Sequence, residues 1–166
     1  MRKAKDKIKT LAQVVEIAEL ARSRGLKVVT QNGCFDLIHV GHTQNLEWCK
    51  SQGDILIVGV NSDRSVKTHK GESRPILPEK ERALALASLE SVDYVFIFDT
   101  DSPIPWIREI KPSIHVKGRG AETHPLFEGE KNAVEEGGGR VMLAPLAKGR
   151  STTGIVETIL KNYGEK

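Results

Sequence analysis

The chain has 166 residues, of which 39% are hydrophobic and 28% are charged. This composition is typical of a folded globular domain and excludes an intrinsically disordered chain. The net charge of +3 is too small, and the basic residues too scattered, to indicate a nucleic-acid-binding protein. Two cysteines are too few for a disulfide-stapled secreted domain, and no apolar run approaches the ~20 residues that span a bilayer. We therefore expect one soluble, cytoplasmic domain, without membrane insertion.

The N-terminal third of the chain alternates between helical and strand patterns. Residues 10–24 have apolar side chains at helical spacing, a capping-box pattern at Thr10 and Gln13, and a glycine stop at position 25. A short buried strand is expected at 26–31 and a helix at 42–52. The run DILIVGVN (54–61) is almost continuously apolar, which is typical of a central parallel strand covered on both faces.

The rest of the chain continues this alternation. The polar segment 62–78, rich in lysine, arginine and glycine, is predicted to be a loop. Strands and helices alternate after it, which predicts an α/β fold with a mostly parallel sheet in a single domain over 1–166. In such sheets ligands bind beyond the carboxyl ends of the strands, so the loops that follow strands are the candidate sites. The expected later helices are 79–92, 102–110, 130–136 and 152–163, and the expected later strands are 93–98, 113–118 and 140–146.

The loop after the first strand, QNGCFDLIHVGH, combines glycines with His39 and His42. Glycines allow a ligand to approach the backbone closely. A helix that begins near His42 would point free N–H groups and the positive end of its dipole at the loop, which makes an anion site. Two imidazoles add donors suited to phosphate oxygens whose charge grows in a transition state. The chain has no GxxxxGK[ST] sequence, so this is not a Walker A loop.

Two further polar segments supply what a polyphosphate requires, namely cations for its charge and donors for its geometry. The segment 62–78 contains several lysines and arginines together with Asp63, and Arg82 lies just beyond it. The segment KGRSTTG (148–154) combines two cations with three hydroxyls at a helix start. The residues concerned are Arg64, Lys67, Lys70, Arg74, Lys148, Arg150, Ser151, Thr152 and Thr153.

Each of these signals has a simpler explanation. His39 and His42 could bind a metal together with Cys34, although no further cluster at familiar spacing completes such a site, and we expect no protein-bound metal. The two histidines could instead only cap or pack a helix. Asp36 could hold its loop by accepting backbone N–H bonds, and the hydroxyls at 151–153 could be a helix cap. The placement of all these groups after successive strands favours a ligand site.

Taken together, these residues resemble the HxGH nucleotidyltransferase superfamily. NGCFDLIHVGH is similar to its first signature and GRSTTGIV to its second. The segments VGVNSDRSVKTHKGESRPI, VDYVFIFD and DSPIPWIREIKPSIHVKG resemble the adenylyltransferases of ADP-heptose biosynthesis over nearly the whole chain. The resemblance implies a Rossmann-like three-layer sandwich, without a kinase domain. It also implies transfer of AMP from ATP, with Mg²⁺, to a sugar 1-phosphate such as D-glycero-β-D-manno-heptose 1-phosphate.

The resemblance also assigns roles to particular residues. His39 and His42 would stabilise the transferring phosphate, and Lys70, or Lys67, would bridge the two substrates. Arg82 would hold a phosphate or the acceptor. The superfamily also implies a homodimer or another homo-oligomer. The remaining residues implied to bind the nucleotide are Asn32, Gly33, Cys34, Phe35, Asp63, Lys117, Gly118, Ser151, Thr152 and Thr153.

Two other functions fit the same residues. One is a cytidylyltransferase that uses CTP and a polyol or alcohol phosphate, and the other is a nucleotide-binding module without catalysis. The segment RGAETHPLFEG (119–129) departs from the heptose family, which usually continues after VKG with a second glycine, an acidic residue and an aromatic residue. This segment is expected near the nucleotide and sugar ends of the site.

Overall fold

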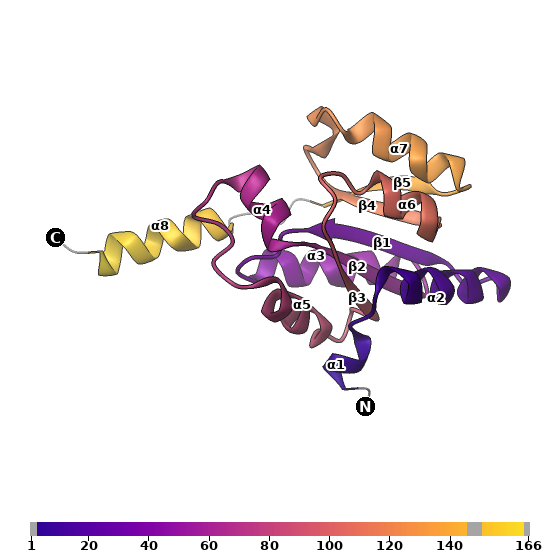
Figure 1. Ribbon diagram of the computed structural model, residues 1–166, viewed down its shortest axis with the longest axis horizontal. Helices are drawn as coiled ribbons and strands as arrows, with labels where there is room; N and C mark the ends of the chain where they lie inside the picture. Colours follow the sequence, from indigo (N-terminus) through magenta and orange to yellow (C-terminus); the bar gives the residue numbers. More distant parts are fainter. Residues whose placement is uncertain (1–2, 146–150, 165–166) are drawn as a thin grey trace.

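The computed structural model describes residues 3–145 and 151–164. Helices and strands alternate along them, as the sequence predicts, and Figure 1 shows their arrangement. The strands are β1 (Val28–Gly33), β2 (Ile55–Asn61), β3 (Tyr94–Phe98), β4 (Ile114–Gly118) and β5 (Arg140–Ala144). The helices are α1 (Ala4–Lys7), α2 (Leu11–Ser23), α3 (Val40–Ser51), α4 (Asp63–Lys70), α5 (Glu79–Ala87), α6 (Ile104–Ile110), the 3₁₀ turn η1 (Ala121–Thr123), α7 (Phe127–Glu136) and α8 (Thr152–Tyr163).

The described strands form one parallel sheet in the order β3-β2-β1-β4-β5. The chain runs outward from β1 to β3, returns to place β4 beside β1, and runs outward again to β5 (Figure 1). The direction of winding therefore reverses between β1 and β4. In a sheet of this kind the crevice beyond the carboxyl ends of those two strands is where ligands bind.

Helices cover both faces of the sheet, which confirms the three-layer sandwich. Side chains alternate along each strand, so neighbouring residues of β2 enter different cores. Leu56 and Val58 pack with buried residues of α3 and α5 on one face. Ile57, between them, packs with buried residues of α2, α6 and α7 on the other. The continuous apolar run of β2 is explained by this burial on both faces.

The ends of several elements agree with the sequence, and others move by a few residues. The capping box of α2 is formed as predicted, with the Thr10 hydroxyl accepting from the Gln13 N–H while the Gln13 side chain accepts from the Thr10 N–H. Helix α3 begins at Val40, because His39 caps it by accepting from the Gly41 N–H at 3.1 Å. Helix α7 begins at Phe127 rather than residue 130, and the short helix α1 was not predicted.

The prediction of a loop over 62–78 is wrong for its first half, where α4 forms. The Ser62 hydroxyl caps this helix by accepting from the Ser65 N–H at 3.0 Å. Only Ser65 and Val66 are buried, so the helix has no apolar stripe that the sequence pattern could reveal. Its basic last turn, which includes Lys67 and Lys70, is favourable because it faces the negative end of the helix dipole.

Helix α8 stands apart from the sandwich. None of its residues is buried, and Figure 1 shows it (yellow) projecting away from the sheet, with its N-terminal end near α4. Ser151 caps it as predicted, by accepting from the Gly154 N–H at 3.0 Å. Lys148 and Arg150 lie outside the described residues. Within those residues no helix has both the length and the apolar character needed to cross a membrane.

Candidate active site

The loop after β1 has a shape that depends on Gly33 and Phe35. Phe35 has a positive φ of 48°, and its buried ring turns back over Gly33. A Cβ on Gly33 would lie 3.2 Å from the Phe35 ring, tighter than most such contacts, so glycine is favoured there. The edge of the same ring meets His42, with centroids 5.3 Å apart. The loop therefore packs the Phe35 ring against the His42 ring.

His39 and His42 are stacked at the N-terminus of α3. Their ring centroids are 4.0 Å apart and the ring planes meet at 25°. Burial, and to a smaller extent the charge of His39, lowers the pKa of His42 from 6.5 to about 4. At neutral pH His42 is therefore an uncharged imidazole that can donate a hydrogen bond, and proximity of a phosphate would favour its protonation.

The basic helix α4 turns one of its two candidate lysines toward this loop. Lys70 lines the cleft that contains His42, and its side chain has no ion pair or hydrogen bond within the described residues. Lys67 lies 3.8 Å from Glu72 through its Nζ and lines neither cleft described below. Of the two lysines that the sequence left open, Lys70 is the one in position to meet a ligand.

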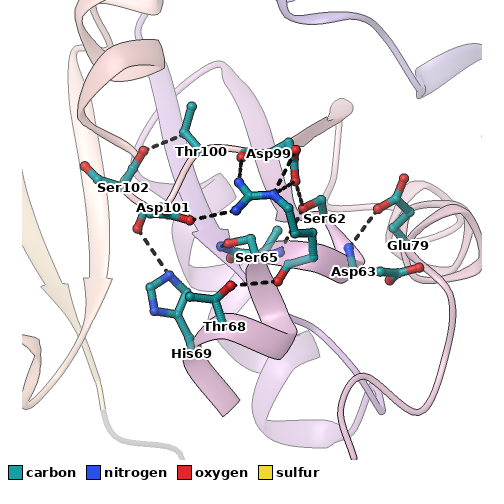
Figure 2. A network of polar contacts seen from close by, with 12 residues as sticks. Ser62, Asp63, Ser65, Thr68, His69, Glu79, Asp99, Thr100, Asp101 and Ser102 are labelled. Atoms are coloured by element: carbon teal, nitrogen blue, oxygen red, sulfur yellow. Dashed lines mark hydrogen bonds and ion pairs between the residues drawn. The ribbon is translucent and has the colours of Figure 1, made fainter. Parts of the chain in front are cut away.

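Helix α4 is clamped to the loop that follows β3 (Figure 2). The Arg64 Nε donates to both carboxylate oxygens of Asp99, at 3.0 and 3.1 Å, and another Arg64 nitrogen lies 3.3 Å from Asp101. The ring of His69 makes a 3.2 Å contact with the Asp101 carbonyl oxygen, and the Ser62 hydroxyl donates to Asp99. These contacts fix the helix that carries Lys70.

Arg82 lines neither of the two clefts described below, and its expected role of holding a phosphate stays a prediction. Its side chain is fully buried, and each of its three guanidinium nitrogens donates to a group inside the protein. It donates to the carbonyls of Cys34, Asn61 and Leu77 and to the carboxylate of Asp63, the last at 2.8 Å. Asp63, another residue expected at the nucleotide, is thus engaged by Arg82. The pair ties the β1 loop to the start of α4.

Asp36 joins the β1 loop to the segment before α5. Its buried carboxylate accepts from an Arg74 nitrogen at 2.7 Å and from the backbone N–H groups of Ile76 and Leu77 at 2.8 and 3.0 Å. Burial acts to raise the pKa of Asp36, but these hydrogen bonds outweigh it and hold the pKa below its usual value. Asp36 accepts backbone N–H bonds as predicted, but from a distant segment.

These elements enclose two adjoining clefts beyond the carboxyl ends of the strands. The first has a volume of about 590 Å³ and the second about 500 Å³. The first brings together predicted residues from three distant segments: Gly33, Cys34 and Phe35 from the β1 loop with His42, Lys70 from α4, and Thr152 and Thr153 from the start of α8. Lys70, Gly33 and Cys34 border both clefts.

The second cleft lies at the switch point between β1 and β4. Predicted residues Asn32 and Lys117 line it, together with residues of the divergent segment 119–129. Lys117 pairs with Glu130, their Nζ and Oε2 atoms being 2.6 Å apart. Gly118 ends β4, and a Cβ added there would meet no other atom within 4 Å. Ser151 and His39 cap the helices α8 and α3, whose first residues include lining residues of the first cleft.

Sequence reasoning did not single out three charged residues of this site. Arg74 was noted only as one cation of a basic segment, and Asp101 follows a strand without any motif around it. Glu130 had one usable signal, because it lies three and four residues before Ala133 and Val134, which share the buried face of α7. Burial raises the pKa of Cys34 above its usual value, so the side chain of this cysteine is a neutral thiol at physiological pH.

Known proteins resemble the chain in sequence. The bifunctional protein HldE of Geobacter metallireducens is 50% identical over 160 residues, which are 96% of this chain and 32% of that protein. HldE of Geobacter sulfurreducens is 46% identical with the same coverage. The chain thus spans about a third of the length of these curated relatives.

Solved structures agree in fold. The lipopolysaccharide core biosynthesis protein from Thermoplasma volcanium has a TM-score of 0.59 and 26% identity, over 76% of this chain and all of that one. Pantoate-beta-alanine ligase from Francisella tularensis has a TM-score of 0.62 over 89% of this chain and 69% of that one. At 16% identity the latter supports the fold alone. A sequence model of the cytidylyltransferase-like family matches residues 31–156, from within β1 to the first half of α8. The chain belongs to the cytidylyltransferase-like family and is a nucleotidyltransferase.

Proposed function

We propose that the protein transfers AMP from ATP to a sugar 1-phosphate, D-glycero-β-D-manno-heptose 1-phosphate, giving ADP-heptose and pyrophosphate for cell-envelope polysaccharide synthesis. The observation that carries this proposal is that His42, Lys70 and the hydroxyls of Thr152 and Thr153 line one cleft. The HldE relatives and the lipopolysaccharide biosynthesis protein favour a sugar phosphate as the acceptor. We also propose that the reaction takes place in the cytoplasm.

In the proposed reaction a phosphate oxygen of the sugar 1-phosphate attacks the α-phosphorus of ATP in line. A new P–O bond forms, the bond from the α-phosphorus to the bridging oxygen breaks, and the electron pair leaves with pyrophosphate. The attacking phosphate is already ionised near neutral pH, so the step requires neither a strong base nor a covalent enzyme intermediate. Positioning and charge stabilisation are then the main contributions of the protein.

Different residues of the first cleft would make these contributions. Lys70, at the border of the two clefts, would lie between the acceptor phosphate and the triphosphate and offset the charge of both. His42 would donate to an oxygen of the transferring phosphate while His39 supports its ring. Thr152 and Thr153, with the free N–H groups of the α8 start, would bind the leaving pyrophosphate.

The carboxylates beside the clefts indicate whether protein side chains could bind a divalent ion. Asp36, Asp101 and Glu130 each lie against a cation of the protein, and no group of three or more metal-binding side chains occurs among the described residues. Such a site suits Mg²⁺ that arrives on the triphosphate, because this ion keeps waters and phosphate oxygens as ligands. When bound there, it would neutralise phosphate charge.

Pyrophosphate release tests this proposal. The purified protein is offered ATP or CTP together with heptose 1-phosphate or glycerol 3-phosphate, and we expect release only with ATP and the heptose. Turnover with CTP alone would overturn the adenylyl assignment in favour of a cytidylyltransferase. ATP binding without pyrophosphate release from any acceptor would indicate a nucleotide-binding module. His42→Ala should abolish turnover while circular dichroism shows an unchanged fold.

A further inference from the structure

The second cleft contains a charge pair that is shielded from solvent. Lys117, at the end of β4, has its Nζ 2.6 Å from the Oε2 of Glu130. The Glu130 side chain is only 4% exposed and the Lys117 side chain 18% exposed. A pair so enclosed interacts more strongly than a surface pair, and loss of either partner leaves the other charge uncompensated.

No other cation shares the Glu130 carboxylate within the described residues. His115 also lies near this carboxylate, with its Nε2 4.0 Å from the Oε2 of Glu130. The Nδ1 of His115 is 2.9 Å from the Thr30 hydroxyl. Burial, together with the charge of Lys117, lowers the pKa of His115 to about 3, so its ring is neutral at physiological pH. Lys117 is therefore the counter-charge of Glu130. This pair adds no net charge to the part of the second cleft that Asn32, Lys117 and Glu130 line, which we call its inner end.

A hydrogen-bond acceptor that lines the same cleft also argues against phosphate as the ligand there. The side-chain oxygen of Asn32, as the amide is oriented in the structure, is buried and has no hydrogen-bond partner among the described residues. It lines the second cleft beside Lys117. A ligand that satisfies this oxygen must offer an N–H or O–H group, which an ionised phosphate does not have. The available cation Lys70 lies on the border with the first cleft.

We propose that Glu130 is a specificity-determining residue that pairs with Lys117 and so excludes phosphate from the inner end of the second cleft. That end then accepts an uncharged, hydrogen-bond-donating part of a substrate, and phosphates bind on the side of Lys70 and His42. This inference rests on the proposed function, which requires a substrate with a charged and an uncharged part. It assigns the order in which those parts lie along the two clefts.

Binding of inorganic pyrophosphate, followed by isothermal titration calorimetry, tests the inference without any turnover. Glu130→Gln leaves Lys117 without its counter-charge, and we expect pyrophosphate to bind about tenfold more tightly or at one additional site. Adding Lys117→Met to Glu130→Gln should remove that gain. Glu136→Gln is the matched control, because it removes the same charge from the same helix at the exposed Arg108 pair, and it should leave pyrophosphate binding unchanged.

Two results would overturn the inference: unchanged pyrophosphate binding in Glu130→Gln, or a gain that persists after Lys117→Met is added. Glu130→Asp keeps the charge, so it should retain the behaviour of the unmodified protein, and a gain in this variant would also contradict the charge argument. Thermal melting of each variant separates these results from loss of the fold. The gain is measurable even in a protein that turns over neither ATP nor CTP, so failure of the proposed function would be recognised separately.

Discussion

His39 and His42 stack at 4.0 Å, with one ring capping α3 and the other supported on Phe35. Two stacked imidazoles cannot both carry a charge at low cost, and burial further disfavours the charged form of His42. In the free protein we expect His42 to titrate near pH 4 when its ring signals are followed by NMR. His39→Asn keeps a capping acceptor but removes the neighbouring charge, so the pKa of His42 should rise while staying below 6.5. Titration of His42 near 6.5 in the unmodified protein would contradict this.

The same shift predicts how stability depends on pH. A histidine whose pKa is lowered in the folded state binds fewer protons there than in the unfolded chain. Between the unfolded value near 6.5 and the folded value of about 4, the contribution of His42 to stability is lost as the pH falls. Urea unfolding at pH 7 and at pH 4.5 should show a smaller loss for His42→Gln than for the unmodified protein. Equal losses in both would contradict this assignment.

The two lysines of α4 provide a matched pair of variants. Lys70→Ala removes the cation that borders both clefts, and kcat should fall by about 100-fold, as is common when a charge-stabilising donor is lost. Lys67→Ala removes the same charge from the same helix, but outside the clefts, and should leave kcat within about twofold. Steady-state pyrophosphate release measures both. A larger loss from Lys67→Ala would move the role to that residue.

Arg82 should behave as a scaffold residue. Arg82→Met leaves the Asp63 carboxylate and three carbonyls without their donor, and we expect the free energy of unfolding to fall by about 3–5 kcal/mol. Urea denaturation measures this, and Arg140→Met, at an exposed arginine, is the control. A stable Arg82→Met protein whose only defect is a raised KM would instead support the phosphate-binding role that the sequence suggested.

The Arg64 clamp should affect rate more than stability. Exposed ion pairs contribute about 0–1 kcal/mol, so Arg64→Ala should change the melting temperature little. Because Arg64 fixes the helix that carries Lys70, kcat should fall roughly tenfold, less than the ~100-fold that a 1 Å displacement can cost. Arg108→Ala breaks a comparably exposed pair with Glu136, which lines neither cleft, and should leave kcat unchanged. Equal kcat losses in the two variants would show that the clamp has no special role.

The parts of the molecule that sequence could predict are those governed by local pattern. The capping box at Thr10 and the apolar run of β2 follow from periodicity and from residue types a few positions apart. Helix α4 was missed because a polar helix with two buried residues has no apolar period. The roles of Arg82 and Glu130 depend on which distant segments meet in the fold. The sequence around an arginine does not tell whether its side chain binds a phosphate or backbone carbonyls.

The exposed helix α8 contributes to the candidate site but not to the buried core. The last strand ends at Ala144 and no residue of α8 is buried, so the sandwich does not depend on α8 for its core. The first cleft does depend on it, through Thr152 and Thr153. A chain that stops after Pro145 should therefore still fold, yet present a phosphate site open along one wall. In the proposed reaction, recognition of the triphosphate would therefore be a property added at the edge of a framework that is already complete.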